Sequence, residues 1–185
     1  MDNFFAMDTK ELIVLLILLV LVIIALRVGR KKGKETRANK LMKKYKVMER
    51  SVLDGLPDGE LVDAVVSRVL ANAENSTRPD PLKVLAEMPY GNTVVYSTWV
   101  ICKELASSDF ATLQKMPSAE LIDRAETAFR ILGADDCAAT FTTLRNATGD
   151  GIAPAEAAFH AAVERECPLT LCEQYIREHT DEFAD

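Results

Sequence analysis

The sequence is poor in the features that identify the most easily recognised protein classes. Four cysteines in 185 residues are too few for a disulfide-stapled small domain. With 49% hydrophobic and 27% charged residues, no low-complexity tract and no internal repeat, the chain is neither disordered nor collagen-like. No catalytic signature is present. What remains is a folded domain with an appendage.

Short motifs that resemble ligand loops are incomplete. Residues 149–151 (Gly-Asp-Gly) form too short a turn to cradle a phosphate, and they lack the acidic alternation of a calcium loop. Ser97, Ser107 and Ser108 have no nucleophile-elbow sequence around them. These stretches therefore favour ordinary turns and helix ends over phosphate, calcium or serine-hydrolase sites.

Charge is divided unevenly along the chain. Residues 1–50 contain 12 basic and 5 acidic groups, a net charge of +7, whereas residues 51–185 contain 10 basic and 23 acidic groups, a net charge of −13. The negative part excludes direct nucleic-acid binding, because phosphate contacts need a basic surface. It suits a basic protein partner, but the same charge also keeps a helical domain soluble, and the two interpretations stay open.

The longest hydrophobic run lies near the N-terminus. Residues 12–26 are fifteen consecutive apolar residues, and the charged heads of Lys10 and Arg27 can snorkel outward to lengthen the span. A cleaved signal peptide is disfavoured, because acidic residues precede the run and no Ala-x-Ala pattern follows it. We predict an uncleaved signal-anchor, with a transmembrane helix over residues 12–29 and a short extracytoplasmic tail over residues 1–11.

A strongly basic segment follows this run. Residues 27–50 contain 11 Lys+Arg and 2 acidic residues, a net charge of +9. The positive-inside rule places this side in the cytoplasm, which predicts a single-pass protein of the plasma (inner) membrane with its N-terminus outside. The residues predicted to contact anionic lipid headgroups are Arg27, Arg30, Lys31, Lys32 and Lys34.

Residues 30–54 are predicted to form a basic, helical juxtamembrane stalk. Lysines cover one face of the predicted helix, and apolar residues recur at helical spacing on the other. The apolar residues are Leu41, Tyr45, Met48 and Val52. Turn formers between residues 54 and 59 mark the start of an acidic cytoplasmic domain, residues 55–185.

The acidic domain is predicted to be all-α, with about seven helices in an irregular, orthogonal arrangement. Apolar residues at helical spacing occur in residues 61–70, 121–132, 137–144, 155–163 and 171–176. Residues 92–102 are rich in strand formers, yet Val95, Trp99 and Cys102 fall at helical spacing, which favours a buried helix. Gly133 is a typical helix stop.

Three stretches are similar to a family of small helical domains of unknown function whose namesake is called a DNA-mimic protein. They are residues 104–110, residues 125–134, and residues 175–179 with Phe183, and the similarity covers about residues 80–183. Where the family has Asn-Gly-Gly, this chain has Ser107-Ser108-Asp109. The resemblance implies an all-α domain with an interaction role, and it implies no catalytic residue.

Two residue patterns are candidates for a metal site or a catalytic site. The spacing His-x6-Cys-x4-Cys-x6-His is formed by His160, Cys167, Cys172 and His179. Thiolates and imidazoles suit zinc, but established sites place their ligands closer together, so buried thiols and surface histidines are favoured. Glu156, His160 and Glu164 lie four residues apart, which fits a general base or a metal half-site, but no second acidic helix matches and helix-surface pairing is favoured. Cys102 and Cys137 are predicted core residues.

The sequence therefore predicts a membrane-anchored cytoplasmic protein-binding or regulatory module that is not an enzyme and needs no cofactor. Its predicted partners are anionic lipid and a protein; a basic protein is one of the two open interpretations of the negative charge. One alternative is a small helical hydrolase or metal-dependent enzyme that uses His160 with Glu156 and Glu164. Another is a structural subunit of a membrane complex.

Overall fold

The computed structural model describes residues 40–41, 43–45, 47–74, 80–115 and 120–185. Within these residues every regular element is a helix: nine α-helices, α2 to α10, and three short 3-10 helices, with no strand. The predicted all-α fold class is confirmed for this part of the chain. The chain divides into two units, Met1–Lys40 and Leu41–Asp185, and the second contains all the helices discussed below.

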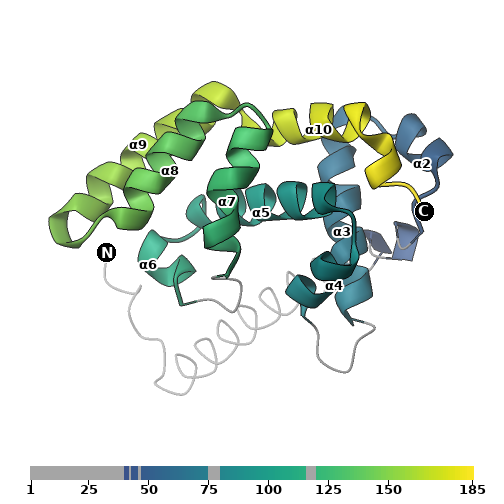
Figure 1. Cartoon of the computed structure of the whole chain (residues 1–185), viewed down its shortest axis with the longest axis horizontal. Coiled ribbons are helices and arrows are strands. Elements are labelled where there is room, and N and C mark those ends of the chain that lie inside the picture. Colours follow the sequence, from purple (N-terminus) through teal and green to yellow (C-terminus); the bar gives the residue numbers. More distant parts are fainter. Residues whose placement is uncertain (1–39, 42, 46, 75–79, 116–119) are drawn as a thin grey trace, which may run out of the picture. The chain divides into compact units, whose positions relative to one another are not determined.

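The helices follow one another through short connections, and Figure 1 shows their arrangement. Their bounds are α2 (Arg50–Gly55), η1 (Asp58–Glu60), α3 (Leu61–Glu74), α4 (Pro81–Glu87), α5 (Tyr90–Leu105), α6 (Phe110–Leu113), α7 (Glu120–Ile131), α8 (Asp135–Asn146), η2 (Gly149–Gly151), α9 (Ile152–Glu166), α10 (Pro168–Glu178) and η3 (Thr180–Glu182). From α3 onward there are eight α-helices, against about seven predicted.

The compact unit begins earlier than predicted. Tyr45 and Met48 are fully buried and belong to the same hydrophobic cluster as Leu61 and Phe183. The stretch is not one continuous helix either, since Glu49 is in an extended conformation (φ −66°, ψ 151°) before α2 begins. The apolar stripe predicted for a stalk is therefore part of the domain core. The structure places the domain boundary at Leu41 rather than at residue 55.

Helix α5 contributes 11 buried residues to the domain, and α3, α4, α7 and α10 all pack against it. Its first half contributes Val94 and Val95 to one hydrophobic cluster, and its second half contributes Ile101 and Leu105 to another. The prediction of a buried helix here is confirmed. Residues 91–98 of α5 are all buried, so its strand-forming residues there are covered by neighbouring helices.

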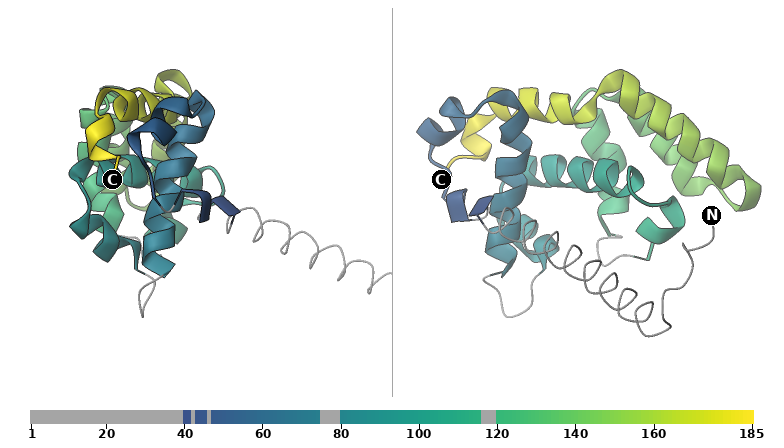
Figure 2. Two further views of the ribbon diagram at one scale, coloured as in Figure 1. Left: turned by 90° about the vertical axis from the view of Figure 1, so that its right-hand side faces the viewer. Right: turned by 180° about the vertical axis from the view of Figure 1, so that it is seen from behind.

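Four phenylalanines from four helices form the centre of the second cluster. Phe110, Phe129, Phe141 and Phe159 come from α6, α7, α8 and α9, and each is at most 1% exposed. Their ring centroids lie 5.4 to 6.3 Å apart in tilted or edge-to-face arrangements. This is the separation at which aromatic pairs attract beyond simple burial. The cluster holds the hairpin of α8 and α9, whose helices lie side by side in Figure 2, against α7.

Gly133 ends α7 as the sequence predicts. Its φ of +75° is in the left-handed region. The Gly133 N–H donates to the Arg130 carbonyl and the Ala134 N–H to the Phe129 carbonyl, at 3.0 and 2.9 Å. This pair of bonds is a Schellman motif, which turns the chain directly into α8.

Helices α4 and α6 are two short helices that the sequence analysis does not resolve as separate elements. Each begins at an aspartate whose side chain accepts a backbone N–H: Asp80 from Leu82 at 3.1 Å, and Asp109 from Thr112 at 2.7 Å. Such N-caps satisfy donors that a short helix otherwise leaves unpaired. With seven and four residues, both are too short to show a helical period in the sequence.

Candidate functional site

The acidic character of the domain is concentrated in helices α7 to α10 and η3. Residues 120–185 contain 14 Asp+Glu against 5 arginines and no lysine. The whole compact unit, residues 41–185, contains 24 acidic and 14 basic residues. A net charge of −9 therefore lies in the last 66 residues, out of −10 for the unit.

All five arginines of residues 120–185 are engaged in ion pairs within the domain. Arg124 pairs with Glu120, Arg130 and Arg145 both pair with Glu126, Arg165 pairs with Asp136, and Arg177 pairs with Asp58. The distances from nitrogen to oxygen are 2.8 to 3.3 Å. The positive charges of these helices are therefore paired with carboxylates of the same domain, and they offer little attraction to an anionic partner.

Four exposed carboxylates of these helices make no ion pair within the part of the chain that the structure describes. They are Asp135, Asp150, Glu164 and Glu178. We call them the free carboxylates. Exposed charges of one sign attract a partner of opposite charge from a distance and give that attraction a dependence on salt. The exposed parts of α7 to α10 and of η2, which carry these carboxylates, are the strongest candidate for a functional site, and we call them the acidic surface.

Ionisation within this region reflects its local surroundings. Burial raises the pKa of the Glu173 carboxyl on α10, and the negative charge of Asp58 raises it further. The pKa of Glu126 is lowered, mainly by its hydrogen bond with Thr142 and then by Arg130. A carboxylate with arginine neighbours is thus stabilised as an anion, whereas one facing another carboxylate is not.

Two further carboxylates, both on α9, cap the N-termini of other helices. Glu156 accepts the N–H of Phe110 at the start of α6. Glu166 accepts the N–H groups of Asp136 and Cys137 at the start of α8, at 3.0 and 2.7 Å. A negative group at this position pairs unsatisfied donors and the positive end of the helix dipole. Their role is therefore structural.

The predicted acid-base pattern Glu156, His160 and Glu164 lies along α9 as expected. Glu156 is occupied by the backbone of α6, while His160 and Glu164 are exposed. The His160 ring contacts its neighbour Phe159, with a centroid separation of 6.3 Å. The arrangement thus consists of one structural carboxylate and two separate surface groups.

The four residues weighed as a zinc site are not brought together. Cys172 is fully buried, whereas His160, Cys167 and His179 are exposed. Cys167 occupies the junction of α9 and α10 with a left-handed backbone (φ 48°). Across the described parts of the chain, no three His, Cys, Asp or Glu side chains are grouped as metal ligands would be.

Cys137 and Cys172 are buried core residues, and Cys102 is a partly buried residue that packs against the core. Burial raises the pKa of the Cys102 thiol to about 12. It also raises the pKa values of Cys137 and Cys172 above their ordinary range. These thiols are therefore protonated at neutral pH, which removes the thiolate that nucleophilic or metal chemistry needs.

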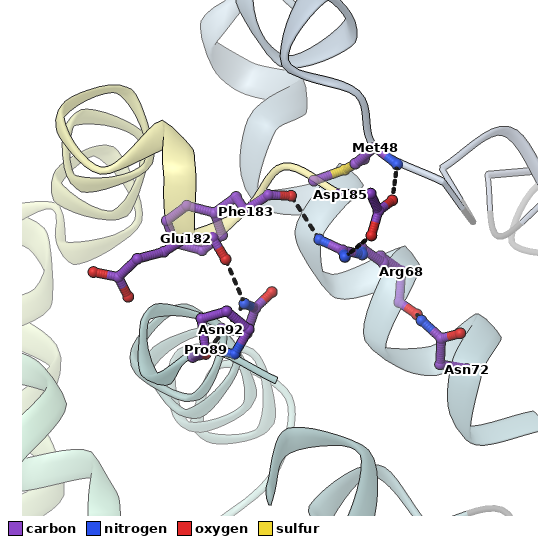
Figure 3. A network of polar contacts seen from close by, with 8 residues as sticks. All are labelled: Met48, Arg68, Asn72, Pro89, Asn92, Glu182, Phe183 and Asp185. Atoms are coloured by element: carbon purple, nitrogen blue, oxygen red, sulfur yellow. Dashed lines mark hydrogen bonds and ion pairs between the residues drawn. The ribbon is translucent and has the colours of Figure 1, made fainter. Parts of the chain in front are cut away.

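A buried polar network joins the end of the chain to the start of the compact unit (Figure 3). The Arg68 guanidinium donates to the Phe183 carbonyl at 2.6 Å and to the Asp185 carboxylate. Asp185 in turn accepts the Met48 N–H at 2.6 Å, and its own N–H donates to the Met48 carbonyl at 2.9 Å. Asn92 on α5 donates to the Glu182 carbonyl at 3.1 Å. The sequence analysis missed this network.

The Ser107-Ser108-Asp109 corner is a helix-capping turn. Asp109 has extended backbone angles (φ −91°, ψ 166°), so it does not adopt the left-handed conformation that a glycine would provide. The Ser108 hydroxyl donates to the Glu104 carbonyl at 2.8 Å, and thereby gives a hydrogen-bond partner to a carbonyl in the last turn of α5. The side chains of the corner are used to end α5 and to begin α6.

The membrane predictions fall outside the described residues. This holds for the transmembrane helix over residues 12–29 and for the lipid-facing residues, which are Arg27, Arg30, Lys31, Lys32 and Lys34. Among the residues that are described, none of the helices combines the length and the hydrophobicity that crossing a bilayer requires.

Comparison of the chain with protein-family models, with curated proteins and with solved structures finds no match. The functional argument consequently depends on the residues and geometry of this chain. The resemblance to the DNA-mimic-like helical family stays a prediction.

Proposed function

We propose that residues 41–185 are a protein-binding module whose acidic surface on α7 to α10 recruits a basic partner protein. The observation that carries the proposal is the distribution of charge. Nearly all of the unit's net negative charge lies in residues 120–185, where every arginine is already paired and four exposed carboxylates have no ion pair with any residue that the structure describes.

Electrostatics of this kind serves recruitment better than catalysis. Opposite charges speed the encounter of two proteins and select against partners of like charge, while each exposed pair adds little affinity. The side chains weighed as catalytic support this interpretation, because Glu156 caps a helix and Cys172 is a buried, protonated thiol.

We also propose that the module is held at the cytoplasmic face of the membrane. Residues 12–29 would span the bilayer, and the basic residues after them would contact anionic headgroups. This part of the proposal is supported by the sequence alone. Protease treatment of intact cells or spheroplasts tests it, since residues 51–185 should be protected until the membrane is opened.

The binding function is tested by neutralising the free carboxylates. A fourfold variant replaces them as Asp135→Asn, Asp150→Asn, Glu164→Gln and Glu178→Gln. A matched control makes the same change in charge at four exposed carboxylates of other helices and turns, as Asp54→Asn, Asp63→Asn, Glu74→Gln and Glu87→Gln. Both variants keep side-chain size, and neither removes an ion pair found among the described residues.

The readout is crosslinking and co-purification of the full chain from native membranes at increasing salt. Recruitment by the acidic surface predicts partners that dissociate as salt rises and that the free-carboxylate variant loses while the control retains them. Partners that stay bound across the salt range, or that both variants retain equally, would contradict the proposal. Salt-independent co-migration in native gels would instead indicate a structural subunit.

A further inference from the structure

Three aromatic side chains lie at the end of the domain where α5 begins and α10 ends. Tyr90, the first residue of α5, is 52% exposed. Tyr175 and His179 on α10 are stacked, with ring centroids 4.2 Å apart and planes at 23°, and His179 is exposed. We call Tyr90, Tyr175 and His179 the aromatic patch.

The backbone around the patch is held by contacts from η3. The Glu182 carboxylate accepts the Gly91 N–H at 2.8 Å, and Asn92 donates to the Glu182 carbonyl (Figure 3). The Phe183 ring contacts Tyr175 edge-on, at 6.2 Å between centroids. Segments far apart in the sequence are thus fixed against one another, and the patch is preorganised.

Two carboxylates lie close to the patch. Glu178 is exposed on the last turn of α10, next to His179 in the sequence, and Glu182 in η3 is half-buried. Burial raises the pKa of the Tyr175 phenol, and the charge of Glu182 and the proximity of Tyr90 raise it further. The nearest arginine in sequence, Arg177, is directed away: it donates to the Leu53 carbonyl at 2.7 Å and pairs with Asp58.

The patch has no cation of its own among the described residues. Two other rings of the domain do: Lys103 lies over the Trp99 ring at 4.2 Å, and Lys44 lies over Tyr45 at 4.6 Å. No lysine occurs after Lys115 in the sequence. The patch therefore combines two exposed rings, Tyr90 and His179, with a half-buried one, Tyr175, beside carboxylates and without a cation contact among the described residues.

We propose that the aromatic patch is the specificity point of the acidic surface, and that it binds an arginine side chain of the basic partner. The inference rests on the proposed function and adds the identity of the recognised group. A guanidinium is planar, so it stacks on the Tyr90 or Tyr175 ring while it donates to Glu178 or Glu182. A lysine ammonium lacks the planar face and the forked donors, so the patch selects arginine.

The test uses two fluorescent probes of equal charge, nona-arginine and nona-lysine, titrated into the full chain in neutral detergent and followed by anisotropy. The test variant Tyr90→Leu removes an exposed ring, and Leu169→Ser, on the surface of the same α10 that carries Tyr175, is its control. Glu178→Gln is compared with Glu164→Gln, because both remove one exposed charge and only the first adjoins the patch.

We expect nona-arginine to bind more tightly than nona-lysine. Tyr90→Leu should weaken nona-arginine binding about threefold, the effect of one cation–π contact at an exposed site, and weaken nona-lysine binding by a smaller factor. Glu178→Gln should reduce the preference for arginine more than Glu164→Gln does. Leu169→Ser should leave it unchanged.

Two different failures are distinguishable. If neither peptide binds at low salt, the acidic surface does not recruit basic partners and the proposed function is wrong. If both peptides bind equally and Tyr90→Leu changes neither affinity, the acidic surface still binds but the aromatic patch is not its specificity point. Equal losses for both peptides with Tyr90→Leu would likewise overturn arginine selection.

Discussion

Replacing Asp185 by alanine removes the acceptor that neutralises a buried arginine. The Arg68 side chain is 10% exposed and the Asp185 side chain 39%. Without Asp185, the guanidinium keeps one protein acceptor, the Phe183 carbonyl. The Met48 N–H loses its partner as well. The variant thus affects both a buried charge and the attachment of the segment that leads into α2.

The magnitude follows from the exposure of the two partners. Breaking a fully buried pair costs about 3–5 kcal/mol, and losing a charge-assisted hydrogen bond costs about 1.5–3 kcal/mol. Because Asp185 is more than a third exposed, water reaches the guanidinium, and we expect Asp185→Ala to lower the free energy of unfolding by about 2 kcal/mol. Arg68→Met removes the charge itself and keeps the packing, so it should cost about 1 kcal/mol.

The double variant makes the reasoning testable. If the two residues act as a pair, it should cost about 2 kcal/mol, less than the sum of the single losses, a coupling of about 1 kcal/mol. Urea unfolding of the full chain in detergent, followed by the fluorescence of its single tryptophan, Trp99, measures all three. The control is Asp181→Ala, whose pair with Arg50 is exposed on both sides and should contribute less than about 0.5 kcal/mol. Additive losses, or an Asp185→Ala loss no larger than the control's, would refute the reasoning.

Three further predictions concern packing, thiols and pH. Gly91→Ala should destabilise the domain by about 1–2 kcal/mol in urea unfolding, because a Cβ there would lie 2.6 Å from the Glu182 carboxylate. A thiol reagent should label Cys167 rapidly in the folded chain and Cys137 and Cys172 only after unfolding; rapid labelling of these two would contradict their burial. The lowered pKa of Glu126 means that its anion stabilises the fold above the ordinary value of 4.5, and that this contribution is lost as pH falls through the folded-state pKa. Glu126→Gln should therefore flatten the acid limb of a stability–pH curve.

The sequence predicted what local periodicity encodes. Helix α5 could be identified although its residues favour strands, because Val95, Trp99 and Leu105 recur at helical spacing. Gly133 was recognisable as a helix stop because glycine adopts the left-handed backbone conformation found there at a lower conformational cost than other residues do. Both features depend on residues only a few positions apart.

The sequence did not predict contacts between distant segments. Glu156 has the same spacing to His160 whether it serves as a base or as a helix cap, and only the fold brings Phe110 to it. The polar network left one detectable signal: Arg68 interrupts an otherwise apolar stripe in α3, and a charge in such a position requires a partner. The identity of that partner, 117 residues away, depends on tertiary structure.

The start of the compact unit could not be predicted for a related reason. Tyr45 and Met48 have helical spacing among lysines. This pattern fits an amphipathic helix on a membrane surface as well as it fits a segment packed on a domain. The structure buries both side chains, and Asp185 holds the backbone of Met48 in place. Periodicity shows which residues share a face, but not what covers that face.

The carboxylates of the domain fall into two groups, and the difference distinguishes binding from solubility. Glu156, Glu166 and Asp185 each satisfy a donor that the fold would otherwise leave unpaired, so their removal should lower stability. The free carboxylates satisfy no such donor, so their neutralisation should leave the free energy of unfolding nearly unchanged. If negative charge serves only solubility, its position is unimportant, and the free-carboxylate variant and its matched control should behave alike. If the charge recruits a partner, the two variants should be equally stable and yet differ in what they bind.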